Sequence, residues 1–354
     1  MDQRVKPAPH EIRRARLDNP KMRERDLAAN LGISEAELVA AHCGEGAKRI
    51  EPRVRELLDE LPALGEVMTL TRNESAVHET IGSFGEVQAS SAAAAVLGSN
   101  VDLRVFFEHW VHGFAVEKRD GDMVRYSLQF FDAEGEAVHK IHLRPGSDVT
   151  AYRALVERHL SSDQGQNVET KPYPAAPEDA VTVEAFSRRE ELRTRWSSMK
   201  DVHQFYGILK NLGVSRHVAV RTVGEDYAWP LDRSVVSAML PLVASEQLPI
   251  MCFVGNRGCT QIYTGPVTEL KTMGPWLNVM DPSFHLHLRT DHIAEVWALR
   301  RPIKEGHLTS IDAYDAKGRL IIQFFGERHE GEDERQDWRS LVENLPRVPA
   351  STAA

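Results

Sequence analysis

The clearest pattern of apolar and polar positions lies in residues 195–220, RWSSMKDVHQFYGILKNLGVSRHVAV. Asp201, followed by Gln204, matches a capping box at a helix start, and Gly213 fits the glycine that ends a helix. Between them, apolar residues recur at the spacing of one buried helix face: Val202, Phe205, Tyr206, Leu209 and Leu212. The pattern predicts an amphipathic helix.

His203 lies at the entrance of this predicted helix, and Gly207 follows four residues later on the same side. A glycine inside a helix costs roughly 1 kcal/mol relative to alanine. Gly207 would leave bare backbone one turn above the imidazole, where a flat ligand could lie. The alternative is that His203 is an ordinary first-turn residue, and the helix alone leaves both interpretations open.

The first half of the chain predicts helices followed by a meander of strands. Helical patterns cover residues 9–41, broken at Asn19-Pro20, and residues 54–64. Residues 90–95 are small and polar, which indicates a loop or a weak helix. Alternating apolar residues predict six strands before a closing helix at 149–160, and these strands are residues 67–71, 76–81, 101–107, 114–118, 126–131 and 137–143.

The pattern then starts again after a stretch rich in Pro, Gln, Ser and Asp at residues 161–179, which we interpret as a linker. LGIS at 31–34 returns as LGVS at 212–215 (212 − 31 = 181). Five further positions correspond at an offset of 183 (256 − 73), four of them with the same residue: Asn73, His78, Gly82, Asp132 and Gly135 match Asn256, Gln261, Gly265, Asp315 and Gly318. A shared pattern of this length indicates a duplication.

The duplication predicts an α+β fold of two tandem structural repeats. Each repeat would be an antiparallel meander sheet with flanking helices, and a ligand cleft is expected between the halves. We divide the chain into an N-terminal repeat (1–165), a linker (166–187) and a C-terminal repeat (188–354) that carries His203.

Residues 25–41 have the helix, turn and helix layout of a DNA reader. The same hairpin recurs at residues 205–220 in a more hydrophobic setting, which favours a structural hairpin. The formal net charge of −9 also argues weakly against broad nucleic-acid binding. A DNA-binding regulator is kept as the alternative function.

The composition of the chain indicates its cellular compartment. The 354 residues contain no apolar run of 18, so no membrane span is expected, and the N-terminus lacks the apolar region of a secretory signal. The three cysteines, Cys43, Cys252 and Cys259, match no common zinc spacing. These features predict a protein of the reducing cytoplasm.

Arginines and histidines are the candidate ligand-binding groups. His285, His287 and Arg289 alternate on one predicted strand face, which could bind a metal or line a ligand site. The turn at residues 255–258 is rich in glycine, but its apolar flanks favour a hairpin over a phosphate loop. Six arginines lie in or beside apolar segments and need carboxylates of the fold or an anionic flat ligand: Arg104, Arg216, Arg289, Arg300, Arg301 and Arg328.

Several long segments resemble the cytoplasmic haem-trafficking and haem-degrading proteins of bacterial haem uptake, often called hemin-degrading factors. The resemblance runs from about residue 19 to 345 and accounts for the duplication, since this family is built as two repeats. The segments that carry it are NESAVHETIGSF (73–84), MKDVHQF (199–205), PIMCFVGNRGCTQIYTGPV (249–267), GPWLNVMDPSFHLHLR (274–289) and FFGERHEGEDERQDWR (324–339).

The resemblance implies haem as cofactor and His203 as the axial ligand of its iron. Arg104 would reach the opposite face of the iron, and the propionates would be held by Arg216, Arg301 and Arg328. His78 matches a family histidine at which a second, weaker haem site is expected, although a core or turn histidine is the alternative there. Phe325 replaces a tyrosine of relatives, and Gln204 replaces one histidine of a cluster that some relatives carry.

The resemblance further implies a cytoplasmic protein that accepts imported haem and delivers it for iron release. Its expected partners are a haem oxygenase and the cytoplasmic side of a haem importer. Family members also degrade haem, so the sequence leaves a carrier and a haem-degrading enzyme open. The alternative becomes a haem-responsive DNA-binding regulator.

Overall fold

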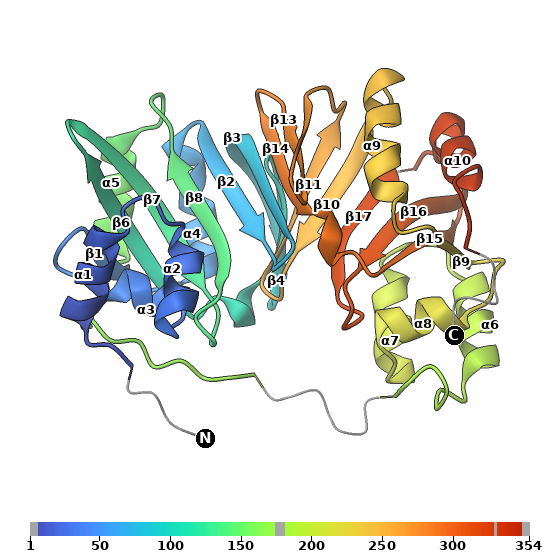
Figure 1. Ribbon diagram of the computed structural model, residues 1–354, viewed down its shortest axis with the longest axis horizontal. Helices are drawn as coiled ribbons and strands as arrows, with labels where there is room; N and C mark the ends of the chain where they lie inside the picture. Colours follow the sequence, from blue (N-terminus) through green and yellow to red (C-terminus); the bar gives the residue numbers. More distant parts are fainter. Residues whose placement is uncertain (1–5, 174–180, 329–330, 349–354) are drawn as a thin grey trace. The chain divides into compact units, whose positions relative to one another are not determined.

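The computed structural model describes residues 6–173, 181–328 and 331–348, which belong to two compact units (Figure 1). Unit 1 comprises residues 1–72, 79–174 and 255–261, and unit 2 comprises residues 73–78, 175–254 and 262–354. Each unit therefore contains most of one half of the sequence and a short segment of the other half. A simple division of the chain at the linker misses these two exchanged segments.

Unit 1 contains a five-stranded antiparallel sheet in the order β1–β6–β7–β8–β2. These strands are β1 (Ala47–Ile50), β2 (Val67–Arg72), β6 (His112–Asp120), β7 (Met123–Phe131) and β8 (Ala137–Leu143). A second meander joins β3 (Ala76–Ala89), β4 (Ala93–Ser99) and β5 (Asp102–Phe106). Its helices are α1 (Pro9–Asp18), α2 (Glu24–Leu31), α3 (Glu35–Ala40), α4 (Val54–Glu60) and α5 (Val149–Arg158), with 3-10 turns η1 (Leu61–Leu64) and η2 (Phe107–His109).

Unit 2 repeats this plan, with the sheet order β9–β15–β16–β17–β10. These strands are β9 (Ala228–Leu231), β10 (Ile250–Gly255), β15 (Glu295–Ile303), β16 (Gly306–Tyr314) and β17 (Leu320–Gly326). Its other strands are β11 (Cys259–Gly265), β12 (Leu270–Met273), β13 (Trp276–Met280) and β14 (Phe284–Arg289), followed by the turn η3 (Thr290–His292). Its helices are α6 (Arg189–Ser197), α7 (Gln204–Leu212), α8 (Arg216–Thr222), α9 (Val235–Ser245) and α10 (Gln336–Glu343).

The predicted duplication is confirmed down to single hydrogen bonds. Asn73 accepts from the backbone N–H groups of Ser75 and Ala76, and its side-chain amide donates to the carbonyl of Ile321. The matching Asn256 accepts from residues 258 and 259 and donates to the carbonyl of Val138. Each of these partners is displaced by 183 residues, so the two exchanged turns are anchored in the same way.

The helical hairpins of the two halves also match. Gly32 and Gly213 end α2 and α7 with positive φ angles of 67° and 63°, a backbone conformation that favours glycine. Ser34 and Ser215 then cap α3 and α8, each accepting from a backbone N–H three residues later. LGIS and LGVS are therefore one helix–turn–helix unit used twice.

The α+β fold with antiparallel meanders is thus confirmed, with local corrections. The predicted loop or weak helix at residues 90–95 is confirmed as a loop for residues 90–92 and is wrong for residues 93–95, because β4 begins at Ala93. β3 extends to Ala89, well beyond the predicted strand end at residue 81. The stretch at 195–220 contains the end of α6, all of α7 and most of α8.

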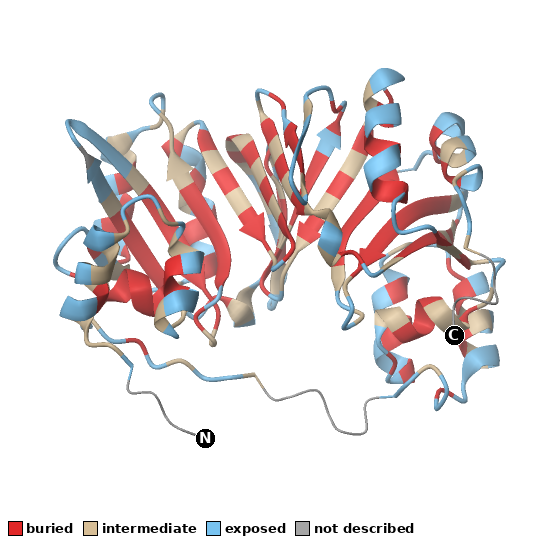
Figure 2. Ribbon diagram, in the orientation of Figure 1, coloured by how far each residue is buried: buried red, intermediate tan, exposed pale blue. Residues whose placement is uncertain are grey.

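The structure does not favour the alternative of a haem-responsive DNA-binding regulator, because α3, the helix that would read DNA, is buried. Every residue of α3 is buried (Figure 2). Glu35 forms a buried ion pair with Lys140, and Ala36, Val39 and Ala40 belong to a core with Phe114 and Phe131. A helix that enters a DNA groove needs an exposed face, so this hairpin is structural.

Candidate functional site

The start of α7 holds the imidazole of His203 in a defined orientation. The Asp201 carboxylate accepts from the backbone N–H of His203 at 2.7 Å, and Nδ1 of the His203 ring lies 2.7 Å from the same oxygen. A carboxylate only accepts, so Nδ1–H donates and the lone pair of the neutral ring stays on Nε2. This is the arrangement in which a histidine ligates a metal through Nε2.

The predicted capping box with Asp201 as N-cap is wrong, because His203 is the N-cap of α7 and makes no side-chain capping hydrogen bond. The helix starts at Gln204, whose side chain accepts from the backbone N–H of Lys200 instead of Asp201. The backbone N–H of His203 lowers the pKa of Asp201, aided by a hydrogen bond from the His203 ring and by charges that include Arg328. Arg328 therefore lies within electrostatic range of the group that orients His203.

The buried face of α7 consists of Phe205, Ile208, Leu209 and Leu212. The prediction that Tyr206 belongs to this face was wrong, because its side chain is 75% exposed. Tyr206 lies three residues after His203, whose side chain is 86% exposed, so both occupy the open side of the helix. A Cβ atom added at Gly207 would meet no other atom within 4 Å. The open side therefore carries an imidazole, a phenol and bare backbone.

Two of the predicted arginines meet beside this helix. The guanidinium groups of Arg216 and Arg301 lie over the ring of Phe205, at 5.2 Å and 5.0 Å from its centre. Both also contact Oδ2 of Asp312, at 3.5 Å and 3.3 Å. Arg301 is 3% exposed, whereas Arg216 is partly exposed. Phe205, two residues after His203, thus places a pair of cations beside the start of α7.

Asp312 is the residue of this site that sequence reasoning missed. It is completely buried on β16, among apolar neighbours such as Ile311 and Ala313. A lone carboxylate within an apolar strand was the available signal, since such a group needs charged or hydrogen-bonding partners. Its partner Arg216 is 96 residues away in sequence, which is why local patterns did not reveal the pair.

The other predicted site residues have different surroundings. His78 is completely buried in unit 2, and its ring lies 4.9 Å from that of Phe284, as expected for a core histidine. A second haem site at His78 would require this packing to open. Arg104 lies on β5 of unit 1 and forms an ion pair with Asp102. Its role opposite the iron stays a prediction.

Most of the remaining arginines are neutralised within the fold. Arg289 pairs with Asp291, Arg300 pairs with Glu343, and Arg328 donates to the backbone carbonyl of Glu332. His285 and His287 share the partly exposed face of β14, as predicted. Within residues 6–173, 181–328 and 331–348, no group of three His, Cys, Asp or Glu side chains is arranged to hold a metal ion.

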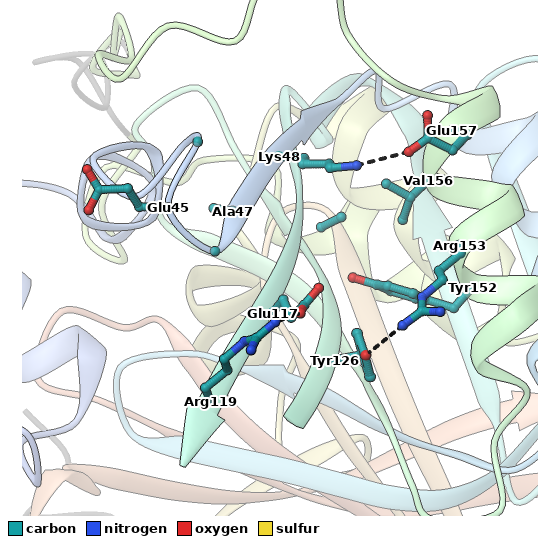
Figure 3. A pocket seen from close by; sticks show the side chains of 13 residues that line it. Glu45, Ala47, Lys48, Glu117, Arg119, Tyr126, Tyr152, Arg153, Val156 and Glu157 are labelled. Atoms are coloured by element: carbon teal, nitrogen blue, oxygen red, sulfur yellow. Dashed lines mark hydrogen bonds and ion pairs between the residues drawn. The ribbon is translucent and has the colours of Figure 1, made fainter. Parts of the chain in front are cut away.

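Unit 1 contains a separate cavity of about 690 Å³, lined by residues of β1, β6, β7 and α5 (Figure 3). Its charged rim is internally paired: Lys48 lies 2.9 Å from Glu157, Arg119 lies 3.5 Å from Glu117, and Arg153 donates to the hydroxyl of Tyr126. None of the predicted site residues lines it. The α7 site is the stronger candidate because it combines an exposed, oriented imidazole with two cations that share one carboxylate.

α8, which carries Arg216, is held against β15 by Glu295. That carboxylate accepts from His217 at 3.1 Å, Arg221 at 3.0 Å and Trp297 at 2.8 Å. Burial would raise the pKa of Glu295, but hydrogen bonds from His217 and Trp297 and the charge of Arg221 outweigh burial and lower it to about 2. The ion pair therefore positions the helix that supplies one of the two cations.

Chemically, this arrangement suits a flat, anionic molecule that contains a metal. Nε2 of His203 can ligate a metal, the open backbone at Gly207 leaves room for a flat ring, and Arg216 can give charge-assisted hydrogen bonds to a carboxylate. Comparison with known proteins identifies the family.

Residues 32–159 and 213–345 match the family described as haemin-degrading HemS.ChuX domain. The chain belongs to this family. It is 38% identical to the hemin transport protein HemS of Yersinia enterocolitica over 333 residues, which cover 94% of this chain and 95% of HemS. The resemblance inferred from the sequence motifs is therefore confirmed.

Solved structures of the family share the whole fold. The haem-bound form of PhuS, a heme-binding protein from Pseudomonas aeruginosa, superposes with a TM-score of 0.93 at 41% identity and covers 97% of this chain and 100% of PhuS. ChuS, an E. coli heme oxygenase, gives a TM-score of 0.83 at 32% identity and covers 94% of this chain and 98% of ChuS.

Among the described residues, every helix is too short or too polar to span a membrane.

Glu295→Gln should lower the free energy of unfolding by about 1–3 kcal/mol at pH 7, since it removes charged hydrogen bonds to His217 and Arg221. A carboxyl group with a lowered pKa stabilises the fold above its ordinary pKa of 4.5 and loses this contribution as the pH falls toward about 2. The difference between variant and wild type should therefore shrink over that range. Urea denaturation at several pH values measures it.

Glu305→Gln, in the exposed turn after β15, is the matched control and should stay within about 0.5 kcal/mol of wild type. A difference for Glu295→Gln that is the same at pH 7 and pH 3 would contradict the role of its charge.

Proposed function

We propose that this protein binds haem, with Nε2 of His203 as the axial ligand of the iron. The observation that carries the proposal is the exposed imidazole of His203, oriented by Asp201 and set beside the cation pair on Phe205. Membership of a haemin-degrading family and the likeness to haem-binding PhuS support it. Haem needs an imidazole and cations for two carboxylates, and α7 and its neighbours provide both.

Each residue has a separate part in the proposed complex. The ring would lie on the open side of α7, over Gly207 and beside Tyr206. Arg216, Arg301 and Arg328 would hold the propionates, with Arg216 the most direct because it is only partly buried. Asp201 would keep the His203 ring turned so that Nε2 faces the iron. Arg104 would act on the opposite face of the iron.

For the biological role, we propose a cytoplasmic carrier that accepts imported haem and delivers it for iron release. A ligand that stands 86% exposed at a helix start is accessible both to a donor and to an acceptor protein. The curated relative is named a hemin transport protein. The cytoplasmic side of a haem importer and a haem oxygenase are the partners that this role requires.

Oxidative degradation of haem is the second candidate, because ChuS is described as a heme oxygenase and is 32% identical to this chain. Bound haem would supply the redox-active iron. In that role, His203 and the propionate-binding arginines would hold the haem, and the guanidinium of Arg104 could donate a hydrogen bond to the reacting group.

His203→Ala should shift the Soret band from its wild-type position toward that of free haem and lower haem affinity at least tenfold, because the variant lacks the proposed iron ligand. Spectral titration with ferric haem measures both effects. His10→Ala is a matched control, since it removes an exposed histidine of α1 in unit 1 that has no part in the proposed site. An unchanged spectrum and affinity for His203→Ala would rule out His203.

Gly207→Leu should lower haem affinity about tenfold or more while leaving the melting temperature of the haem-free protein within a few degrees of wild type. The added side chain meets open space in the free protein, and leucine has a higher helix propensity than glycine. It would occupy the surface on which the ring is proposed to lie. Equal haem affinities would contradict this placement.

Carrier and enzyme are separated by incubating the haem complex with a physiological reductant and catalase. If the protein is a carrier, the complex incubated with catalase keeps its Soret band over the time in which free haem, incubated without catalase, is degraded. This is the result that we expect. Loss of the band with a tetrapyrrole product despite catalase would show enzymatic degradation. Loss only without catalase would indicate attack by peroxide.

A further inference from the structure

The carboxylate of Asp312 divides its two oxygens between neutral and charged partners. Oδ1 accepts from the hydroxyl of Ser310 at 2.7 Å and from the amide of Gln323 at 2.9 Å. Oδ2 accepts from the hydroxyl of Tyr314 at 3.3 Å and faces Arg301 and Arg216. The neutral donors on Oδ1 therefore fix the rotation of the carboxylate, and this rotation turns Oδ2 toward both guanidinium groups.

The charges of this cluster do not cancel. Two guanidinium groups share the single negative charge of Asp312, so one positive charge is left over. Burial lowers the pKa of Arg301, although Asp312 acts in the opposite direction. The buried Nε of Arg301 has no hydrogen-bond partner among the described residues. A buried cation with an unused donor is costly, and an added carboxylate would satisfy both the charge and the donors.

At the equivalent positions of unit 1, residues of the chain itself neutralise the cations. Lys118 and Gln129 occupy the positions of Arg301 and Asp312 (301 − 118 = 183; 312 − 129 = 183). Glu24 and Glu35 occupy those of Phe205 and Arg216 (205 − 24 = 181; 216 − 35 = 181).

In unit 1, Glu24 contacts Lys118, and both Glu24 and Glu35 contact the buried Lys140. Side-chain carboxylates of the α2–α3 hairpin thus neutralise Lys118 and Lys140. Unit 2 has no carboxylate at these two hairpin positions, because Phe205 and Arg216 stand there instead. Its surplus charge is accordingly open to a carboxylate from outside the chain.

We infer that Asp312 is a positioning residue for ligand carboxylates: it holds the guanidinium groups of Arg216 and Arg301 on the ring of Phe205 and leaves one positive charge for a carboxylate of the ligand. This inference rests on the proposed function, because it takes haem as the ligand. It adds a role for a residue that does not itself touch the ligand and acts only through the two arginines.

The test compares ferric haem with its dimethyl ester, in which both carboxylates are blocked. Asp312→Asn keeps the shape of the side chain but removes its negative charge. One carboxylate oxygen becomes an NH₂ group, which faces groups that are themselves hydrogen-bond donors. The variant should bind haem at least tenfold more weakly than wild type, as expected for lost charged hydrogen bonds. Its affinity for the dimethyl ester should change less than twofold, with the wild-type Soret maximum retained.

Ser310→Ala is a milder variant in case Asp312→Asn does not fold. It removes one neutral hydrogen bond that orients the carboxylate, so haem affinity should fall about threefold and ester affinity should not change. Ser127→Ala is the matched control, because Ser127 is the buried equivalent of Ser310 in unit 1 (310 − 127 = 183). It should leave both affinities unchanged.

Equal losses for haem and ester in Asp312→Asn and Ser310→Ala would show a purely structural role and overturn the inference. Tighter haem binding by Asp312→Asn would also overturn it, because Asp312 would then act as a competing anion. The proposed function is checked separately by the wild-type titration: if wild type fails to bind haem, the proposed function fails, whereas binding by wild type without the predicted selectivity contradicts only the role of Asp312.

Discussion

The packing of the apolar face of α7 is the constraint on which the candidate site depends. Phe205, Leu209 and Leu212 are buried in a core formed with α6, α8 and the sheet of unit 2. Because an α-helix turns about 100° per residue, burying these positions forces His203, Tyr206 and Gly207 to the outside. The same burial brings the ring of Phe205 under the two arginines. One hydrophobic contact surface therefore sets both the exposure of the imidazole and the place of the cations.

The duplicated scaffold separates what the fold requires from what the site requires. Both halves keep the Gly and Ser that shape the helical hairpin, and both keep the Asn that anchors the exchanged turn. These residues satisfy backbone groups, a demand that does not change between copies. The halves differ where the chemistry differs: Met22 stands at the position of His203 (203 − 22 = 181), and Glu35 stands at that of Arg216. The residues proposed to bind the ligand therefore belong to one copy and not to both.

Much of the fold could be predicted from the sequence because strand alternation and turn residues act locally. β8 was predicted with its observed ends, and the duplication was visible in single residues such as Asn73 and Asp132. The side of Tyr206 was misjudged because the spacing of apolar residues on α7 is compatible with either Tyr206 or Ile208 on the buried face. Only the packing of Ile208 against the core decides between them.

The site itself was less accessible to local reasoning. The pattern around His203 and Gly207 allowed two interpretations, a ligand site or an ordinary helix start. Only the family resemblance indicated that the ligand is haem. The shared partner of Arg216 and Arg301 could not be found, because Asp312 lies 96 residues from Arg216 and meets Arg301, 11 residues away, only when β15 pairs with β16. Long-range ion pairs of this kind follow from tertiary structure and leave no periodic signal.

The most direct test of the account is a titration of the wild-type chain with ferric haem, followed at the Soret band. The account predicts saturation with a single break at one haem per chain and the spectrum of histidine-ligated iron. The absence of saturable binding, or a spectrum without histidine ligation, would contradict it.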